Sequence, residues 1–252
     1  MKKIICLFII IIYSCSPDLC LKDVELNYKY TPVEGKFIGI WPGDILMNTF
    51  RDLQILADEF GMKGIYLSAY NSEYTKLIKG WVNTLNLYVL KDISLDNWEK
   101  NILEYDAQFY YVDEPDMAGG SGVTREGVEQ RRDFIKVIKP GSVMIISGTL
   151  NLLRDNYIPI SGCGYMYSRY LEDQSEDWRV IKKKLGGGFE MSWIKLGDGC
   201  DEYDNLLSTA NELGLKWIWL YGWQDNDVKS ETIKHLHQFC QAAIRHGWLK
   251  NL

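Results

Sequence analysis

Apolar and polar positions along this chain form two kinds of segment that follow one another repeatedly. Apolar runs rich in β-branched and aromatic residues, typical of buried strands, begin near Lys36, Lys63, Asn86, Ala107, Ser142, Cys163, Phe189 and Lys216. Between these runs lie segments in which apolar residues recur every three or four positions, the spacing of one helix face. The pattern predicts eight strands, repeating every 21 to 35 residues, that alternate with about eight helices.

The clearest predicted helix covers residues 48–60. Its apolar residues fall on one face, and Gly61 follows at the position where a glycine commonly ends a helix. The same spacing predicts helices over residues 74–85, 95–105, 125–138, 177–185, 203–213 and 231–246. The segment 150–159 carries the weakest pattern, so we expect a short or irregular helix there.

Strict alternation of strands and helices favours the α/β class, with a parallel sheet covered by helices. Eight such units fit a (β/α)₈ barrel, and no linker rich in Pro, Gly or Ser interrupts them. We therefore expect one barrel domain over residues 21–252. The alternative is an open, doubly wound sheet, but no strand is followed by a GxGxxG turn. The glycines at 186–188 precede a strand and are interpreted as a turn.

Residues 1–20 are expected to lie outside the fold as a signal peptide and a short tether. Lys2 and Lys3 precede an apolar run from Ile4 to Tyr13 that is too short to span a bilayer but is typical of a secretory signal. The sequence from Ile12 to Cys15 resembles the lipobox of bacterial lipoproteins. The resemblance implies cleavage before Cys15, lipidation of its thiol and a membrane anchor in the cell envelope. The alternative is an ordinary signal peptide and a secreted protein.

Charge and residue usage exclude several function classes. The formal net charge is −6, and the only basic stretch is Lys182–Lys184, so we expect no nucleic-acid partner. The three histidines, His235, His237 and His246, all fall in the last predicted helix, far from the strand ends where a catalytic metal would be held. No cysteines form a CxxC pair. We expect neither a metal nor another cofactor.

In a barrel of this type the active site lies at the carboxyl ends of the strands. The residues expected there are rich in aromatic rings, carboxylates and amides, which suit the apolar faces and hydroxyl groups of sugars. The candidate substrate-binding residues are Trp41, Tyr70, Asn71, Lys91, Tyr167, Arg169, Glu172, Trp193, Tyr221 and Trp223. They predict an oligo- or polysaccharide partner. The alternative is that some of these rings only fill the barrel, since Tyr and Trp also pack in protein interiors.

The fourth predicted strand ends in two adjacent carboxylates. The run Phe109–Val112 is followed by Asp113, Glu114 and Pro115. A carboxylate at the end of a buried strand needs partners or a raised pKa, which favours acid/base chemistry. The alternative is that these acids cap the next helix or pair with a lysine such as Lys91.

The tripeptide Asp113-Glu114-Pro115 resembles the Asn-Glu-Pro that ends the fourth strand in many retaining glycoside hydrolases of the (β/α)₈ type. The resemblance implies that Glu114 is the general acid/base. Those families carry a nucleophilic Glu at the end of the seventh strand, where this chain has Asp198 as a possible substitute. Asp113 also departs from the pattern, because it replaces the usual Asn.

Adjacent Asp and Glu residues also resemble the barrel hexosaminidases that use substrate-assisted catalysis. That resemblance implies that Asp113 orients the acetamido group of the substrate, with Tyr167 or Tyr221 bonded to the acetamide oxygen. Both mechanisms stay open, with Glu114 as the acid in each. A catalytically silent, glycan-binding surface lipoprotein is the alternative from another functional class.

Overall fold

The computed structural model describes residues 29–41, 50–68, 72–115, 120–168, 174–197, 200–222 and 229–252. Eight parallel strands close into a barrel in chain order. They are β2 (Phe37–Trp41), β3 (Gly64–Leu67), β4 (Tyr88–Asp92), β5 (Phe109–Val112), β6 (Val143–Gly148), β7 (Cys163–Tyr167), β8 (Met191–Lys195) and β9 (Trp217–Tyr221). The predicted (β/α)₈ barrel is confirmed.

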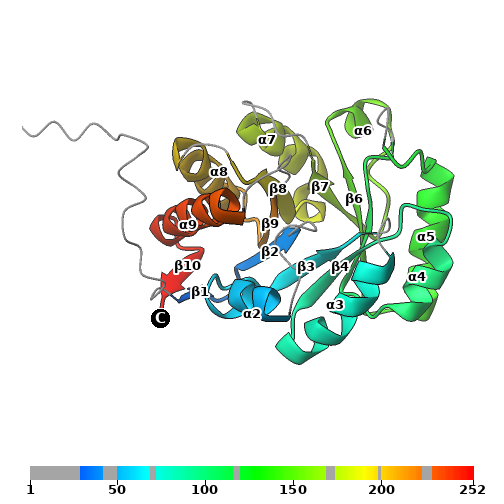
Figure 1. Ribbon diagram of the computed structural model, residues 1–252. Helices are drawn as coiled ribbons and strands as arrows, with labels where there is room; N and C mark the ends of the chain where they lie inside the picture. The colour runs from blue at the N-terminus through cyan, green and yellow to red at the C-terminus, as the bar shows by residue number, and fades with distance from the viewer. Residues whose placement is uncertain are drawn as a thin grey trace, which may run out of the picture.

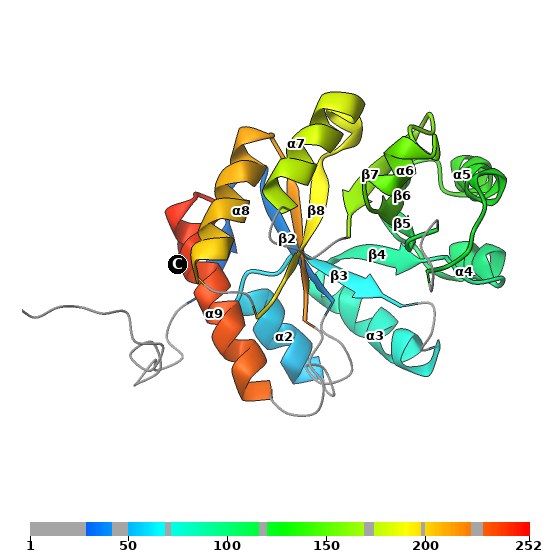
Figure 2. The same cartoon turned by 90° about the horizontal axis from the view of Figure 1, so that it is seen from above.

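Helices surround the barrel in sequence order, as Figures 1 and 2 show from two directions. They are α2 (Phe50–Asp58), α3 (Ser72–Leu85), α4 (Trp98–Glu104), α5 (Arg125–Ile138), α6 (Asn151–Arg154), α7 (Gln174–Leu185), α8 (Cys200–Glu212) and α9 (Lys229–Arg245), with the short 3₁₀ turn η2 (Gly186–Gly188) after α7. The α5 bounds match the predicted ones. The four residues of α6 confirm that this unit is short. In the described ranges no helix combines the length and apolar character that a bilayer crossing needs.

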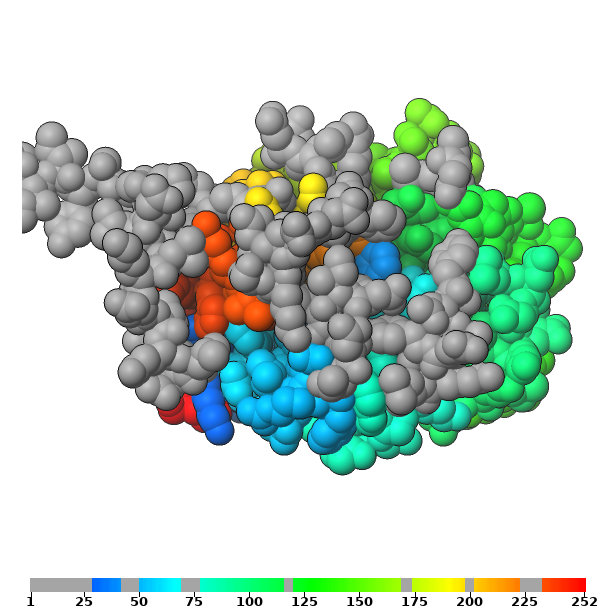
Figure 3. Space-filling model, viewed as in Figure 1, coloured from blue at the N-terminus to red at the C-terminus, as the bar shows by residue number. Residues whose placement is uncertain are grey.

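A small antiparallel sheet was not predicted. Strand β1 (Tyr30–Pro32) pairs with β10 (Leu249–Asn251), so that Tyr30 lies opposite Asn251. In Figure 3 the two strands lie side by side at the surface, blue against red. The backbone amide of Tyr30 donates to the carbonyl of Glu59 at 2.8 Å, where the chain leaves α2 to enter β3. The sheet therefore lies at the amino-terminal end of the barrel strands.

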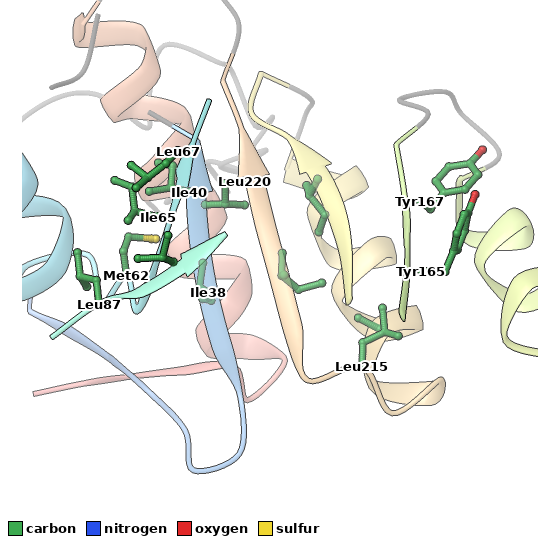
Figure 4. Close-up of a cluster of buried hydrophobic side chains, with 14 of the residues drawn as sticks. Ile38, Ile40, Met62, Ile65, Leu67, Leu87, Tyr165, Tyr167, Leu215 and Leu220 are labelled. Carbon is green, nitrogen blue, oxygen red and sulfur yellow. The ribbon is translucent and has the colours of Figure 1, made fainter. Parts of the chain in front are cut away.

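The outer faces of the strands pack against the helices. Ile38, Ile40, Ile65, Leu67 and Leu220 are buried there and lie close together in Figure 4. The inner faces are apolar as well, because aromatic rings fill the barrel. Both faces of each strand are thus buried, which is typical of parallel barrels and explains the nearly continuous apolar runs in the sequence.

Two glycines make room for a tryptophan side chain inside the barrel. Gly39 and Gly64 are partners on neighbouring strands, and both face the indole ring of Trp219. A Cβ atom on Gly39 would lie 2.3 Å from that ring, and one on Gly64 would lie 2.7 Å from it. Below Trp219, the rings of Trp217 and Phe37 stack at a centroid distance of 4.6 Å. We call the opening at the carboxyl ends of the strands the mouth. The aromatic packing closes the barrel beneath it.

Candidate functional site

The backbone turn that carries the acid pair directly follows β5. Asp113 lies two residues beyond Tyr111, which packs inside the barrel, so it continues the inward face of the strand. Glu114 has a φ of 36°, a left-handed value that is uncommon for residues other than glycine. A returning segment covers the turn: Ser121 donates its backbone amide to the Asp113 carbonyl at 3.3 Å. A Cβ atom on Gly120 would lie 2.0 Å from the Glu114 carbonyl oxygen, so only glycine fits there.

The carboxyl group of Asp113 is held from below by a hydrogen-bonded pair of aromatic side chains. The Tyr111 hydroxyl donates to Asp113 Oδ1 at 2.8 Å, and Trp193 Nε1 donates to the same hydroxyl at 3.2 Å. Burial raises the pKa of Asp113 from 3.8 to about 7; the Tyr111 hydrogen bond lowers it, while the charges of Asp92 and Glu114 raise it further. This carboxyl therefore titrates near neutral pH.

Glu114 has a different partner from Asp113. The hydroxyl of Ser168 donates to Glu114 Oε1 at 2.9 Å. Ser168 directly follows β7 and is almost fully buried, whereas Glu114 is only partly buried. Since β6 lies between β5 and β7 in the barrel, Glu114 spans the end of a whole strand. The two acids are adjacent in sequence but are fixed by different parts of the mouth.

A third carboxylate lies next to the pair; it falls at a predicted strand end but is not among the predicted catalytic or binding residues. Asp92 is the last residue of β4 and is fully buried. It accepts hydrogen bonds from the Tyr66 hydroxyl at 2.8 Å, the Ser94 amide at 2.8 Å and the Ser94 hydroxyl at 2.6 Å. Ser94 Oγ in turn accepts the backbone amide of Asp113 at 2.9 Å. The sequence feature that could have identified Asp92 is its position at a strand end, two residues after Leu90, because residues two apart on a strand face the same side and Leu90 faces inward.

Aromatic rings from three strands form one side of the mouth. Trp41 and Tyr221 have ring centroids 4.8 Å apart, and Trp193 lies 6.3 Å from Tyr221. Trp41 and Tyr221 are partly exposed, while Trp193 is buried beneath them. Burial raises the pKa of Tyr221 to about 12, and the charges of Asp113 and Glu114 add to this effect. The Tyr221 hydroxyl is therefore within electrostatic reach of both acids.

Two predicted binding residues lie on the opposite face of their strands, toward the helices. Lys91 is buried, donates to the Ser68 carbonyl at 2.9 Å and lies over the Tyr105 ring. Burial lowers its pKa to about 8. The hydroxyl of Tyr167 donates to Asp177 on α7, and Figure 4 shows its ring on the same side of β7 as Tyr165. The structure does not bring Lys91 or Tyr167 together with the acid pair.

Several predicted residues fall outside the described ranges. They are the proposed nucleophile Asp198, the binding candidates Tyr70, Asn71, Arg169, Glu172 and Trp223, and the proposed lipidation site Cys15. Their roles stay predictions. Over the ranges that the structure does describe, no group of three or more His, Cys, Asp and Glu residues is arranged to hold a metal ion.

Comparisons with known proteins agree on the architecture. No family model matches the chain, and no curated protein matches its sequence. Among solved structures, a sugar phosphate isomerase/epimerase from Parabacteroides distasonis superimposes with a TM-score of 0.59 and 12% identity, covering 83% of this chain and 96% of that one. A thiamine phosphate pyrophosphorylase from Pyrococcus furiosus gives 0.53 and 14%, covering 84% and 96%.

An endo-β-mannanase/endo-β-glucanase from Prevotella bryantii is also similar, with a TM-score of 0.54 and 11% identity. The match covers 82% of this chain and 48% of that chain. At such low identity the likeness shows the fold alone. The chain is a single-domain (β/α)₈ barrel.

Proposed function

We propose that the protein is a glycoside hydrolase-like enzyme in which Glu114 is the general acid/base and Asp113 assists it. The observation that carries this proposal is the pair of adjacent carboxyl groups at the barrel mouth, each fixed by its own hydroxyl donor, beside partly exposed aromatic rings. Proteins of similar fold include an endo-β-mannanase/endo-β-glucanase and a sugar phosphate isomerase/epimerase, so a carbohydrate substrate is compatible with this fold, although the fold does not specify the reaction.

Glu114 suits the role of proton donor because it is both anchored and accessible. Ser168 fixes one of its carboxyl oxygens, and the partly exposed side chain stands at the mouth. A leaving glycosidic oxygen can reach hydrogen-bond distance there, which general acid catalysis requires. The rings of Trp41 and Tyr221 offer an apolar surface for a sugar ring near the same position.

Asp113 suits the role of a group that orients the substrate. Tyr111 fixes Oδ1, and within the described part of the chain Oδ2 has no protein partner. When ionised, Oδ2 can accept the amide N–H of a 2-acetamido sugar and hold the acetamide oxygen for attack on the anomeric carbon. Among the described residues, Asp113 and Glu114 at the mouth directly follow β5, and Asp92, one layer below them, ends β4. Substrate assistance by Asp113 is the mechanism that these described carboxylates can supply, and Asp198 stays the candidate for a second enzymic carboxylate.

The test is turnover of a panel of aryl glycosides, including N-acetylglucosaminides, by the purified protein and by Glu114→Gln. We expect the variant to lose about two or more orders of magnitude in kcat. Glu104→Gln is the matched control, because Glu104 is exposed at the end of α4 on the opposite side of the barrel from the mouth. Activity confined to acetamido sugars supports the role of Asp113.

Failure of the proposal has a clear signature. If no substrate is turned over, and a glycan binds equally well to the protein and to Glu114→Gln, the enzyme assignment is overturned. The aromatic rings at the mouth then belong to a glycan-binding protein.

A further inference from the structure

Asp92 is a buried charged group that the proposed reaction does not itself use. It lies on the inner face of the barrel, one layer below the mouth, and is 0% exposed. Three donors converge on it: the Tyr66 hydroxyl and both the amide and the hydroxyl of Ser94. An acid is costly to bury, so a carboxylate held in this way calls for a reason beyond packing.

The hydrogen bonds from Asp92 lead directly to the acid pair. The single proton of the Ser94 hydroxyl points to Asp92 Oδ1 at 2.6 Å, so its oxygen is free to accept from the other side. It accepts the backbone amide of Asp113 at 2.9 Å. The donors and acceptors in this series of hydrogen bonds are fixed, because a carboxylate can only accept hydrogen bonds and the Ser94 hydroxyl must therefore donate to Asp92. The series ends at the first residue of the turn on which Glu114 adopts its left-handed conformation.

We propose that Asp92 is a positioning residue for the acid pair: through the Ser94 hydroxyl it fixes the backbone turn that places Asp113 and Glu114 at the mouth. The role rests on the proposed function, since it concerns the same two acids. Asp92 touches neither carboxyl group directly and acts through Ser94.

Packing supports the same assignment. The Tyr66 ring contacts Tyr111 at a centroid distance of 5.5 Å and Trp193 at 5.9 Å, and these are the two side chains beneath Asp113. Asp92, held by Tyr66, and Asp113, held by Tyr111, are thus supported by two rings in contact. Displacement of Asp92 would disturb both the backbone and the side-chain support of Asp113.

The charge of Asp92 gives the role a measurable signature. Among the described residues, the groups that face Asp113 are Tyr111 and Glu114 from its own segment, Asp92 and Ser94 from the β4 side, and Tyr221 from β9. Among them, Asp92 and Glu114 raise the Asp113 pKa by their charge. Removal of the Asp92 charge therefore lowers this pKa and reports that the two carboxyl groups are close, whereas a change at Ser94, which keeps the charge, reports the positioning itself.

The experiment follows the Asp113 carboxyl carbon by ¹³C NMR as a function of pH, with the signal assigned through Asp113→Asn. For Asp92→Asn we expect the midpoint to fall from about 7 by roughly half a unit or more. Ser94→Ala removes the hydrogen bonds that link Asp92 to the Asp113 amide and leaves the charge unchanged. For this variant we expect the chemical shift of the Asp113 carboxyl carbon to change, and kcat to fall about tenfold with KM little changed. Ser121→Ala is the matched control, because the Ser121 hydroxyl is buried near the same turn and has no hydrogen-bond partner among the described residues.

The outcomes are separable from those of the proposed function. If Asp92→Asn does not fold, Ser94→Ala and Tyr66→Phe carry the test, since each removes one hydroxyl and no charge. Folded variants in which the Asp113 titration and kcat match the control overturn the proposal. If the Asp113 signal responds as expected but neither the protein nor any variant hydrolyses a glycoside, the positioning role stands and the glycosidase assignment fails.

Discussion

The hydroxyl group of Ser168 donates a hydrogen bond to Oε1 of Glu114 at 2.9 Å, and this contact joins the ends of two strands that are not neighbours in the barrel. Ser168 is itself fixed, because its backbone amide donates to the Gly148 carbonyl at 3.0 Å. The contact helps to hold Glu114 in a backbone conformation that most residues avoid. Strain at a candidate catalytic residue is thus balanced by a specific donor.

Loss of this donor is expected to impair catalysis more than folding. For Ser168→Ala we expect kcat on an aryl glycoside to fall by about one order of magnitude, as for a lost hydrogen bond of about 1–2 kcal/mol. Ser175→Ala is the control, because the buried Ser175 hydroxyl on α7 has no hydrogen-bond partner in the described part of the chain. Equal kcat values for the two variants would show that Ser168 does not position Glu114.

The raised pKa of Asp113 makes stability depend on pH. The folded protein keeps the Asp113 proton up to a pH of about 7, whereas the unfolded chain releases it near 3.8. The folded state therefore binds more protons between these values, and its stability declines as the pH rises through this window. Asp113→Asn removes this pH dependence. We therefore expect the free energy of unfolding of the variant, relative to that of the unmodified protein, to increase as the pH rises from about 4 to about 7.

The measurement is urea unfolding of both proteins at about pH 5 and about pH 8. Asp58→Asn is a matched control, because Asp58 is exposed at the end of α2. If Asp113→Asn and Asp58→Asn respond to pH in the same way, Asp113 is not protonated in the folded protein at the lower pH.

The glycines inside the barrel give a test of the core. Gly39→Ala would place a Cβ atom 2.3 Å from the Trp219 ring, so we expect a loss of about 1–3 kcal/mol or more in the free energy of unfolding. Gly80→Ala on α3 meets open space, and we expect a gain of roughly 0.5–1 kcal/mol from the better helix former. Thermal unfolding of the two variants measures how the same added methyl group changes stability inside the barrel and on an open helix surface. A stable Gly39→Ala protein would contradict the packing around Trp219.

The proposed anchor at Cys15 is tested in cells. We expect the protein to take up a labelled fatty acid and to enter the detergent phase, and Cys15→Ala to abolish both. Cys163→Ala is the control, since Cys163 is a free thiol at the start of β7. Labelling that persists in Cys15→Ala would contradict lipidation at this position.

The fold was largely predictable because local patterns specify each unit. Each strand is a short apolar run, and each helix has one apolar face, so the eightfold alternation is visible in the sequence. The β1–β10 pairing was not predictable, because each strand has three residues and their partners lie at opposite ends of the chain. This pairing depends on contacts between residues far apart in the sequence, which a local pattern does not reveal.

The site was predictable only in part, and β4 shows why. The sequence places Lys91 and Asp92 together at a strand end, but only one of two adjacent strand residues can face the barrel interior. Both faces of this strand are buried, so Val89 and Leu90 are both apolar and the pattern does not reveal which face is inward. The predicted binding residue is Lys91, whereas Asp92 is the residue that the structure places beside the acid pair.

The β1–β10 sheet also bears on how the molecule would stand on a cell surface. The described chain enters the fold at the end of the barrel remote from Asp113 and Glu114. Fourteen residues separate Cys15 from Tyr30, a tether of at most about 50 Å. With a lipid on Cys15, the tether would join the barrel at the end remote from the mouth, so the attachment point itself would leave the mouth uncovered.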